Sequence, residues 1–202
     1  MGKIKFFMLG IITAFGALFL ELLLFTFFNL DLGATYLYSN SLSWSLIFSA
    51  FLEESVKIVI LYQILKKIIQ AGMERKNIFL SALMAGLGFS ATEILFYLFN
   101  SQINSPLSFR DVFGLLVVHT GTFAILGYVL AKKTGLSFPG FTLFFPVIFL
   151  FHLLYNSLVL YRWNSGFYWL FTISSLILIL VFWGNLKRHS LEKNLPKSEI
   201  GL

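Results

Sequence analysis

The sequence predicts an all-α, polytopic membrane bundle of about six transmembrane helices. Apolar residues make up 58 % of the 202 residues, charged residues make up 12 %, and there are 25 Phe. A soluble domain of this length carries roughly twice that share of charge. Six segments also contain about 20 mostly apolar residues each, which is the length that spans a bilayer as a helix.

The six expected spans cover residues 4–28, 42–66, 76–100, 110–132, 138–161 and 166–186. The first is too long for the apolar core of a signal peptide and lacks a small-residue cleavage site, so we expect it to stay as a helix. The apolar runs are also too long for barrel strands. We expect one catalytic domain over 1–188 and a polar cytoplasmic tail over 189–202, in which His189 has no role.

The distribution of Lys and Arg predicts the topology. Two cations, Arg110 and Arg162, lie on one side of the expected spans, and Lys57 lies within a span. The other side collects twelve: Lys3, Lys5, Lys66, Lys67, Arg75, Lys76, Lys132, Lys133, Lys187, Arg188, Lys193 and Lys197. We therefore expect a multi-pass protein of a prokaryotic plasma membrane with both termini in the cytoplasm. Trp44, Trp163 and Trp169 fall near the expected outer boundary, where indole rings favour the interface.

Composition also excludes several functions. The sequence has no Cys, which rules out disulfides, thiol nucleophiles, Cys-ligated zinc and iron–sulfur clusters. The net charge of +6 is split into short clusters between apolar spans and forms no single patch. We therefore expect no nucleic-acid partner, and a lipid bilayer as the surroundings.

Ionisable residues inside the spans indicate a functional site, because each one costs several kcal/mol unless it faces water or a partner. They come from five different spans: Glu21, Glu53, Glu54, Lys57, Glu93, His119 and His152, with the polar Asn156 beside the last. We expect Glu21 to reach the outer interface. The remaining glutamates and both histidines lie at about 10–18 Å depth in the outer half of the membrane, judged from a rise of 1.5 Å per residue. Their convergence in depth predicts one site.

Helical spacing predicts which of these groups cooperate. Lys57 follows Glu53 by four residues and Glu54 by three, so it can pair with either carboxylate. His152 and Asn156 share a face, also at a spacing of four. In the third span, small residues at Ala82, Gly86 and Ser90 with Gly88 nearby allow a close helix approach beside Glu93.

The same residues form a recognisable pattern. The segment 53–57, EESVK, resembles the EExxK motif of PrsW-type intramembrane proteases, which are related to CAAX prenyl proteases. The segment 86–93, GLGFSATE, resembles that family's GxGFxxxE, and His119 and the HLLYN of 152–156 resemble its later His and HxxxN motifs. The resemblance covers about residues 50–156. Two departures are that Ile94 stands where the family often has Asn, and that relatives often have more helices.

The resemblance implies hydrolysis of a peptide bond in a membrane-anchored protein by an activated water. Glu53 or Glu54 would be the general base, and His119 would help to hold the water. His152 and Asn156 would donate hydrogen bonds to the oxyanion, and Lys57 would fix the neighbouring carboxylate. Glu93 would belong to the catalytic set or form a helix–helix hydrogen bond, and Lys57 and Asn156 also have purely structural interpretations. No cofactor is expected.

Three other interpretations stay open at this point. Intramembrane Glu and His also mark ion paths in carriers, although the inverted repeats and broken helices of carriers are not evident. A metal-dependent protease would use zinc, with Glu53, Glu93, His119 and His152 as ligands, although no HExxH motif is present. A non-catalytic membrane binding protein is the third. The sequence does not identify the substrate.

Overall fold

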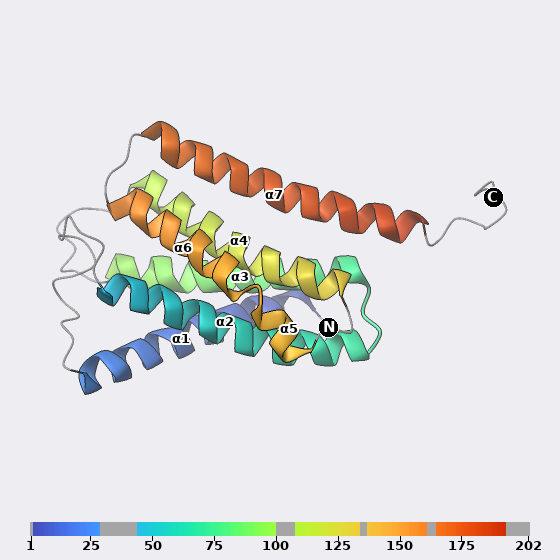
Figure 1. Cartoon of the computed structure of the whole chain (residues 1–202), viewed down its shortest axis with the longest axis horizontal. Coiled ribbons are helices and arrows are strands. Elements are labelled where there is room, and N and C mark those ends of the chain that lie inside the picture. The colour runs from blue at the N-terminus through green and yellow to red at the C-terminus, as the bar shows by residue number, and fades with distance from the viewer. Residues whose placement is uncertain (1, 29–43, 100–107, 134–136, 161–164, 193–202) are drawn as a thin grey trace.

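Seven helices make up the part of the chain that the computed structural model describes, residues 2–28, 44–99, 108–133, 137–160 and 165–192. They are α1 (Lys3–Phe27), α2 (Trp44–Gln70), α3 (Arg75–Phe99), α4 (Phe109–Lys132), α5 (Phe138–Thr142), α6 (Phe145–Leu160) and α7 (Ser165–Glu192). Successive long helices run in alternating directions along the long axis of the molecule, and α7 lies along one side of the bundle (Figure 1). The predicted helical membrane fold is confirmed, with no strand in the described residues.

Five spans are long and apolar enough to cross a membrane: Lys3–Phe27, Arg75–Phe99, Phe109–Lys132, Phe138–Val159 and Ser165–Arg188. Helix α2 has the length, at 27 residues, but it contains Glu53, Glu54 and Lys57 near its middle. The helix that departs from the composition of a membrane span is therefore the one that provides three of the candidate site residues.

The expected fifth span, 138–161, is divided into α5 and α6. Pro146 has no N–H to donate to the carbonyl of Thr142, so a continuous helix would lack that bond. The chain instead turns at Leu143 and restarts at Phe145, which places Pro146 in the first turn of α6, where proline is tolerated. The expected single helix at this position was wrong in this detail.

Helix α3 lies at the centre of the bundle and packs most extensively against α4 and α1. Small residues make these contacts close. A Cβ on Gly88 would collide with the carbonyl oxygen of Phe7 on α1, and a Cβ on Gly86 would lie 2.8 Å from the Cα of Thr120 on α4. The predicted small-residue faces therefore exist, with Gly88 toward α1 and Gly86 toward α4 beside His119.

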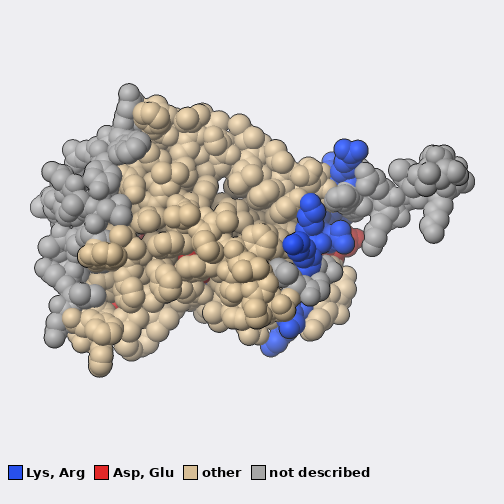
Figure 2. All heavy atoms as spheres, viewed as in Figure 1, with Lys and Arg blue, Asp and Glu red and all other residues tan. Residues whose placement is uncertain are grey.

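Specific capping interactions begin and end two of the helices. Ser108 and Asp111 form a reciprocal capping box at the start of α4. Gly72, with φ of 80°, closes α2 in a turn whose Met73 N–H bonds the Ile68 carbonyl. The Lys and Arg atoms visible in Figure 2 gather at one end of the molecule, and the rest of that face is almost entirely without charge.

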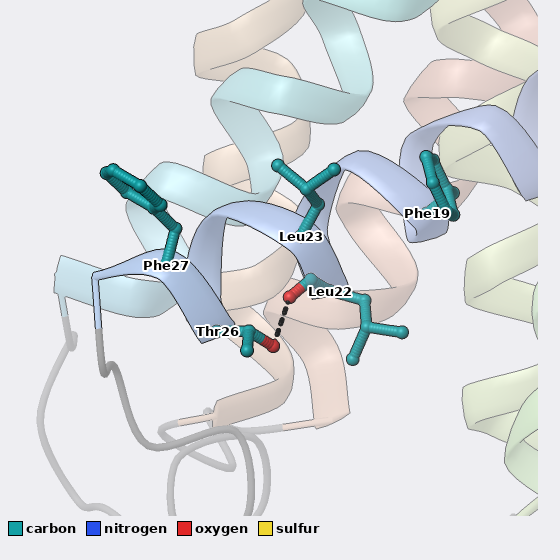
Figure 3. A pocket seen from close by; sticks show the side chains of 5 residues that line it. All are labelled: Phe19, Leu22, Leu23, Thr26 and Phe27. Carbon is teal, nitrogen blue, oxygen red and sulfur yellow. Dashed lines mark hydrogen bonds between the residues drawn. The ribbon is translucent and has the colours of Figure 1, made fainter.

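The outer surfaces of α1 and α7 are apolar, as lipid contact requires. Figure 3 shows a hollow on α1 lined by Phe19, Leu22, Leu23, Thr26 and Phe27. Its polar group is already satisfied, because the Thr26 hydroxyl donates to the Leu22 carbonyl at 2.7 Å. Four of its five side chains are large, exposed hydrophobic groups. This hollow is apolar and lies on one helix, apart from the charged cluster.

Four sequence expectations concern residues or side chains beyond this description. Trp163, Arg162 and residues 193–202 lie outside the described residues, as does the side chain of His189. Helix α7 itself continues to Glu192, past the expected end of the sixth span at 186.

Candidate active site

Four helices bring the predicted polar residues together inside the bundle. Helix α2 provides Glu53, Glu54 and Lys57; α3 provides Glu93; α4 provides His119; α6 provides His152. Counted from the nearer helix end opposite the basic end, the glutamates and histidines lie about 9–15 Å in and Lys57 about 20 Å in, at 1.5 Å of rise per residue. Asn156 is half-buried one turn beyond His152 on the same face of α6. The shared depth inferred from the sequence corresponds to direct contacts in the structure.

Lys57 is the central cation of the cluster, and its side chain has no exposed surface. Its ammonium nitrogen lies 2.6 Å from Oε1 of Glu54, 2.9 Å from Nδ1 of His119 and 3.8 Å from Oε2 of Glu53. It also lies 4.3 Å from the centre of the Phe89 ring, within the range of a cation–π interaction. An unpaired buried ammonium would be very costly, so these contacts are what allow Lys57 to lie here.

Glu54 is the fully buried carboxylate of the pair. Its Oε1 accepts from Lys57 and lies 2.7 Å from Nδ1 of His152. Because an ionised carboxylate can only accept, Nδ1 of His152 is the donor in this contact. Glu54 thus links α2 to α6 and fixes the orientation of the His152 ring.

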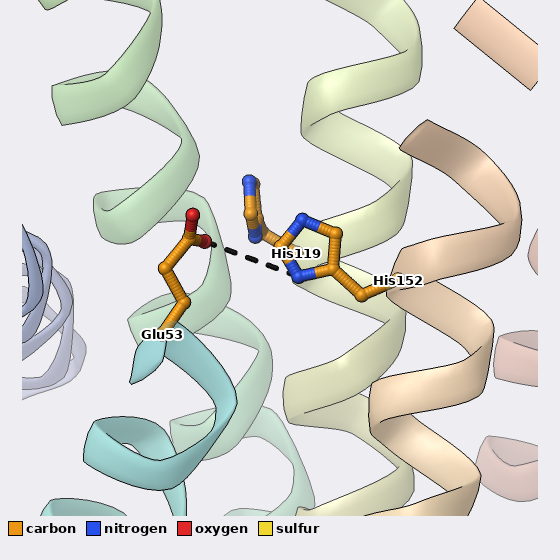
Figure 4. A group of neighbouring side chains, drawn as sticks. All are labelled: Glu53, His119 and His152. Atoms are coloured by element: carbon orange, nitrogen blue, oxygen red, sulfur yellow. Dashed lines mark ion pairs between the residues drawn. The ribbon is translucent and has the colours of Figure 1, made fainter. Parts of the chain in front are cut away.

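Glu53 has a different environment, although it is the adjacent residue. Its side chain is 11 % exposed, whereas that of Glu54 is 0 % exposed. Its Oε2 has no hydrogen-bond partner, and the nearest positive or imidazole nitrogens are Lys57 Nζ at 3.8 Å and His152 Nδ1 at 3.9 Å. Figure 4 shows its carboxylate pointing from α2 toward the two imidazole rings. Glu53 is therefore the more accessible glutamate of the pair, and Oε2 of Glu54, which also has no hydrogen-bond partner, is fully buried.

His119 lies between Lys57 and Glu93. An ammonium has only donors, so Nδ1 of His119 accepts from Lys57, and in a neutral ring the proton is then on Nε2. That nitrogen is in ion-pair contact with Oε2 of Glu93. The ring also packs edge to face on His152, with centroids 5.1 Å apart. Glu93 therefore belongs to the same cluster and is not a separate helix–helix contact.

A metal ion would find three possible ligands here. Ligand atoms of Glu53, His119 and His152 all lie within 4.8 Å of one another, and two His with one Glu is a known zinc set. The unpartnered Oε2 of Glu53 also fits such a role. The three side chains thus fit a metal ion in their type and spacing. Lys57 disfavours such an ion, because it occupies Nδ1 of His119 and because its positive charge repels a cation.

One intramembrane residue does not lie where the sequence suggested. Glu21 was expected to reach the outer interface, but it is only 7 % exposed and accepts a 2.6 Å hydrogen bond from Ser49. Ala17, Glu21 and Phe25 form one buried stripe at a spacing of four, so the face of α1 that carries Glu21 packs inward. The spacing of four between Ala17, Glu21 and Phe25 is present in the sequence and is compatible with an inward-facing Glu21.

A polytopic bundle with a buried cluster of carboxylates, imidazoles and one ammonium, in contact across four helices, defines a membrane-embedded protein with a site suited to acid–base chemistry. Comparison with known families identifies the class. The chain matches the model of the PrsW family intramembrane metalloprotease over residues 3–184, and it therefore belongs to that family. It is an integral membrane protein and an intramembrane protease. No curated protein and no solved structure matches the chain.

Proposed function

We propose that this protease cleaves a membrane-anchored protein with a water molecule activated by Glu53. The main support for this proposal is the difference in environment between the two adjacent glutamates. Oε2 has no hydrogen-bond partner in either glutamate, but Oε1 of Glu54 is held by Lys57 and His152 and its side chain is 0 % exposed, whereas the side chain of Glu53 is 11 % exposed. A general base needs a free lone pair that water can reach, and this favours Glu53.

In the proposed reaction, Glu53 moves one proton from the attacking water to the leaving amide nitrogen. Glu53 takes one proton from water while the water oxygen bonds to the carbonyl carbon of the scissile peptide, which gives a tetrahedral oxyanion. Glu53 then gives the proton to the amide nitrogen as the C–N bond breaks. The products are a carboxyl terminus and an amine, and Glu53 is returned to its initial state.

The remaining residues of the cluster orient this chemistry. Glu54 holds His152 through Nδ1, which leaves Nε2 of the ring to donate to the oxyanion when the ring is protonated. Asn156, on the same face of α6, is the second proposed donor. Lys57 and Glu93 occupy the two nitrogens of His119, so we assign His119 to holding these two groups in place beside Glu53 and not to holding the water.

A metal-dependent mechanism is the second candidate, because the ligand atoms of Glu53, His119 and His152 lie within 4.8 Å of one another. Those three residues would hold the ion, and a zinc ion would supply a bound hydroxide at neutral pH. Glu54 would then orient His152 by accepting from its other nitrogen, a common arrangement around metal ligands. We favour the glutamate mechanism because Lys57 lies inside the same cluster and donates to His119.

The substrate class follows from where the cluster lies. The site is about 9–15 Å from the helix ends opposite the basic end, in the outer half of the membrane if the basic end is cytoplasmic. We therefore propose a membrane-anchored substrate that is cut close to the extracytoplasmic face. Family membership gives no support to the carrier or to the non-catalytic binding protein.

Comparison of membrane proteomes tests this proposal. Cells without the protease receive either the wild type, Glu53→Gln or the control Glu74→Gln. Glu74 is an exposed residue whose carboxylate pairs with Lys76. At least one membrane-anchored protein should stay intact with Glu53→Gln and be shortened with the other two. Identical proteomes for wild type and Glu53→Gln, at equal expression, would overturn the proposal.

A further inference from the structure

Three aromatic rings meet where α2 packs against α6. The ring of Phe51 on α2 lies edge to face on that of Phe145 on α6, with centroids 5.1 Å apart, and its centroid is 6.2 Å from that of Phe149. The rings of Phe145 and Phe149 are stacked on one another. Phe51 is 43 % exposed and lies about 10 Å from the outer end of α2 by helical rise, so its ring borders the lipid. We call these three rings the aromatic seam.

The aromatic seam belongs to the same helix–helix interface as the site. On α6, Phe145, Phe149 and His152 follow one another at spacings of four and three, so they share one face of the helix. On α2, Phe51 precedes Glu54 by three residues. Glu54 and His152 are in contact at 2.7 Å and are buried, whereas Phe51 is exposed. The rings therefore form the lipid-facing layer of this interface, and the polar cluster lies behind them.

The interface between α1 and α3 is built differently. It also has an exposed aromatic pair, Phe15 and Phe96, with centroids 5.5 Å apart. Its backbones, however, are in direct contact, because a Cβ on Gly88 would collide with the carbonyl oxygen of Phe7. Backbones in contact cannot be parted by the rotation of a side chain. The contact between the rings of α2 and α6 is made by side chains, so rotation of one ring is enough to open it.

The enclosure of the site limits how a membrane-anchored substrate reaches it. The side chains of Glu54 and Lys57 have no exposed surface. The transmembrane helix of a substrate stays in the bilayer, because its apolar side chains are soluble there. A peptide bond at the depth of the cluster therefore arrives sideways, between two helices of the protease. A ring that turns from the seam into lipid exchanges one apolar environment for another, so this movement has little cost.

We propose that the aromatic seam is the docking surface for the transmembrane helix of the substrate, and that the Phe51 ring turns into the lipid to admit the scissile segment. This inference rests on the proposed function, which supplies the membrane-anchored substrate. The partner is an apolar helix that lies in the bilayer and not a soluble peptide. Entry from the outer end of the bundle is the alternative that the experiments must distinguish.

Reversible closure of the seam tests this route. The chain has no Cys, so Phe51→Cys with Phe145→Cys introduces the only two thiols, which a short, reducible bis-methanethiosulfonate reagent joins. Phe15→Cys with Phe96→Cys is the matched control, because that pair is also exposed and edge to face. The substrate is a tagged copy of the membrane protein that stays intact in cells with Glu53→Gln. Joining the seam should slow cleavage at least tenfold, and reduction should restore it. The joined control should stay within twofold of its reduced form, and full cleavage by the protein with the joined seam would overturn the proposal.

A second measurement distinguishes a blocked route from a distorted site. Phe51 is replaced by the photoreactive p-benzoylphenylalanine in protein that also carries Glu53→Gln. This protein and the tagged substrate are reconstituted together in vesicles of phosphatidylethanolamine and phosphatidylglycerol. Illumination should attach at least five times more substrate at position 51 than when the same photoreactive residue replaces Phe15. Attachment at position 51 that is no greater than at position 15 would overturn the docking, even if joining the thiols blocks cleavage.

The state of the attached substrate separates this inference from the proposed mechanism. Intact substrate attached at position 51 supports both. Shortened substrate attached there would show that Glu53→Gln still cleaves, which would refute the proposed base and leave the docking at the aromatic seam standing. Intact substrate that attaches equally at positions 51 and 15 would refute the docking and leave the proposed base standing.

Discussion

Oε1 of Glu54 lies 2.7 Å from Nδ1 of His152, across 98 positions of sequence, and the same oxygen lies 2.6 Å from the ammonium of Lys57. One carboxylate therefore compensates a buried cation and orients an imidazole on another helix. Glu53 makes neither contact at hydrogen-bond distance. This difference supports the proposed division of roles, with Glu54 in structure and Glu53 in chemistry.

The first prediction separates these two glutamates by stability. Glu54→Gln should lower the free energy of unfolding by about 3–5 kcal/mol, because it leaves the buried ammonium of Lys57 without its nearest charge. Glu53→Gln should change stability little, since Oε2 of Glu53 has no hydrogen bond to lose. Both should abolish cleavage. Thermal unfolding in detergent, followed by circular dichroism, measures the difference.

Equal unfolding temperatures for Glu54→Gln and Glu53→Gln would contradict this division of roles. A double variant gives an internal control. The loss of free energy of unfolding in Lys57→Met with Glu54→Gln should be smaller than the sum of the losses in the two single variants, because each single change leaves the partner's charge unpaired and the double change removes both charges.

The second prediction concerns the oxyanion. His152→Ala should lower kcat about 100-fold or more and leave KM nearly unchanged, because a donor to the oxyanion acts mainly in the transition state. Steady-state kinetics on the purified protein gives both constants. A raised KM with normal kcat would assign His152 to substrate binding instead.

The third prediction tests the close packing that brings α1 and α3 together. Gly88→Ala should destabilise the protein by about 1–3 kcal/mol, because its Cβ would collide with the Phe7 carbonyl oxygen. Gly16→Ala is the matched control, since its nearest neighbour outside its own helix would be Val56 Cγ1 at 4.0 Å. Both changes favour a helix equally, so only packing separates them. Equal unfolding temperatures of the two variants would contradict this packing.

The fourth prediction is the topology. Both termini should be cytoplasmic, because the twelve cations of one side flank the spans on that side. A fusion of alkaline phosphatase to the C-terminus should be inactive, and a fusion of green fluorescent protein should fluoresce. Strong phosphatase activity at the C-terminus would reverse the orientation and place the site in the inner half of the membrane.

The sequence was sufficient to predict the helices and the composition of the cluster, for one physical reason. In lipid, apolar length marks each span, and the cost of burying charge makes every intramembrane Glu, His or Lys informative. Equal depth on successive spans then predicted that Glu93, His119 and His152 would meet the glutamate pair, and their contacts agree with this expectation.

Three features of the structure were not predicted from the sequence. Adjacent residues on a helix differ by about 100° in direction, and only the packing of α6 against α2 shows that Glu54, rather than Glu53, meets His152. Depth alone suggested the interface for Glu21, because Ser49 is an ordinary residue in sequence and its bond is formed across helices. The break before α6 depends on Pro146, whose effect on a membrane helix varies with its neighbours.

Cleavage of the identified substrate by purified protein, with and without chelator, distinguishes a water activated by Glu53 from a water activated by a metal ion. Wild type should keep its activity after treatment with EDTA or phenanthroline, and Glu53→Gln should be inactive under both conditions, because the proposed base is a carboxylate and needs no metal ion. Activity that is lost with chelator and restored by zinc would establish the metal-dependent mechanism at Glu53, His119 and His152. Activity retained by Glu53→Gln would contradict Glu53 as the base.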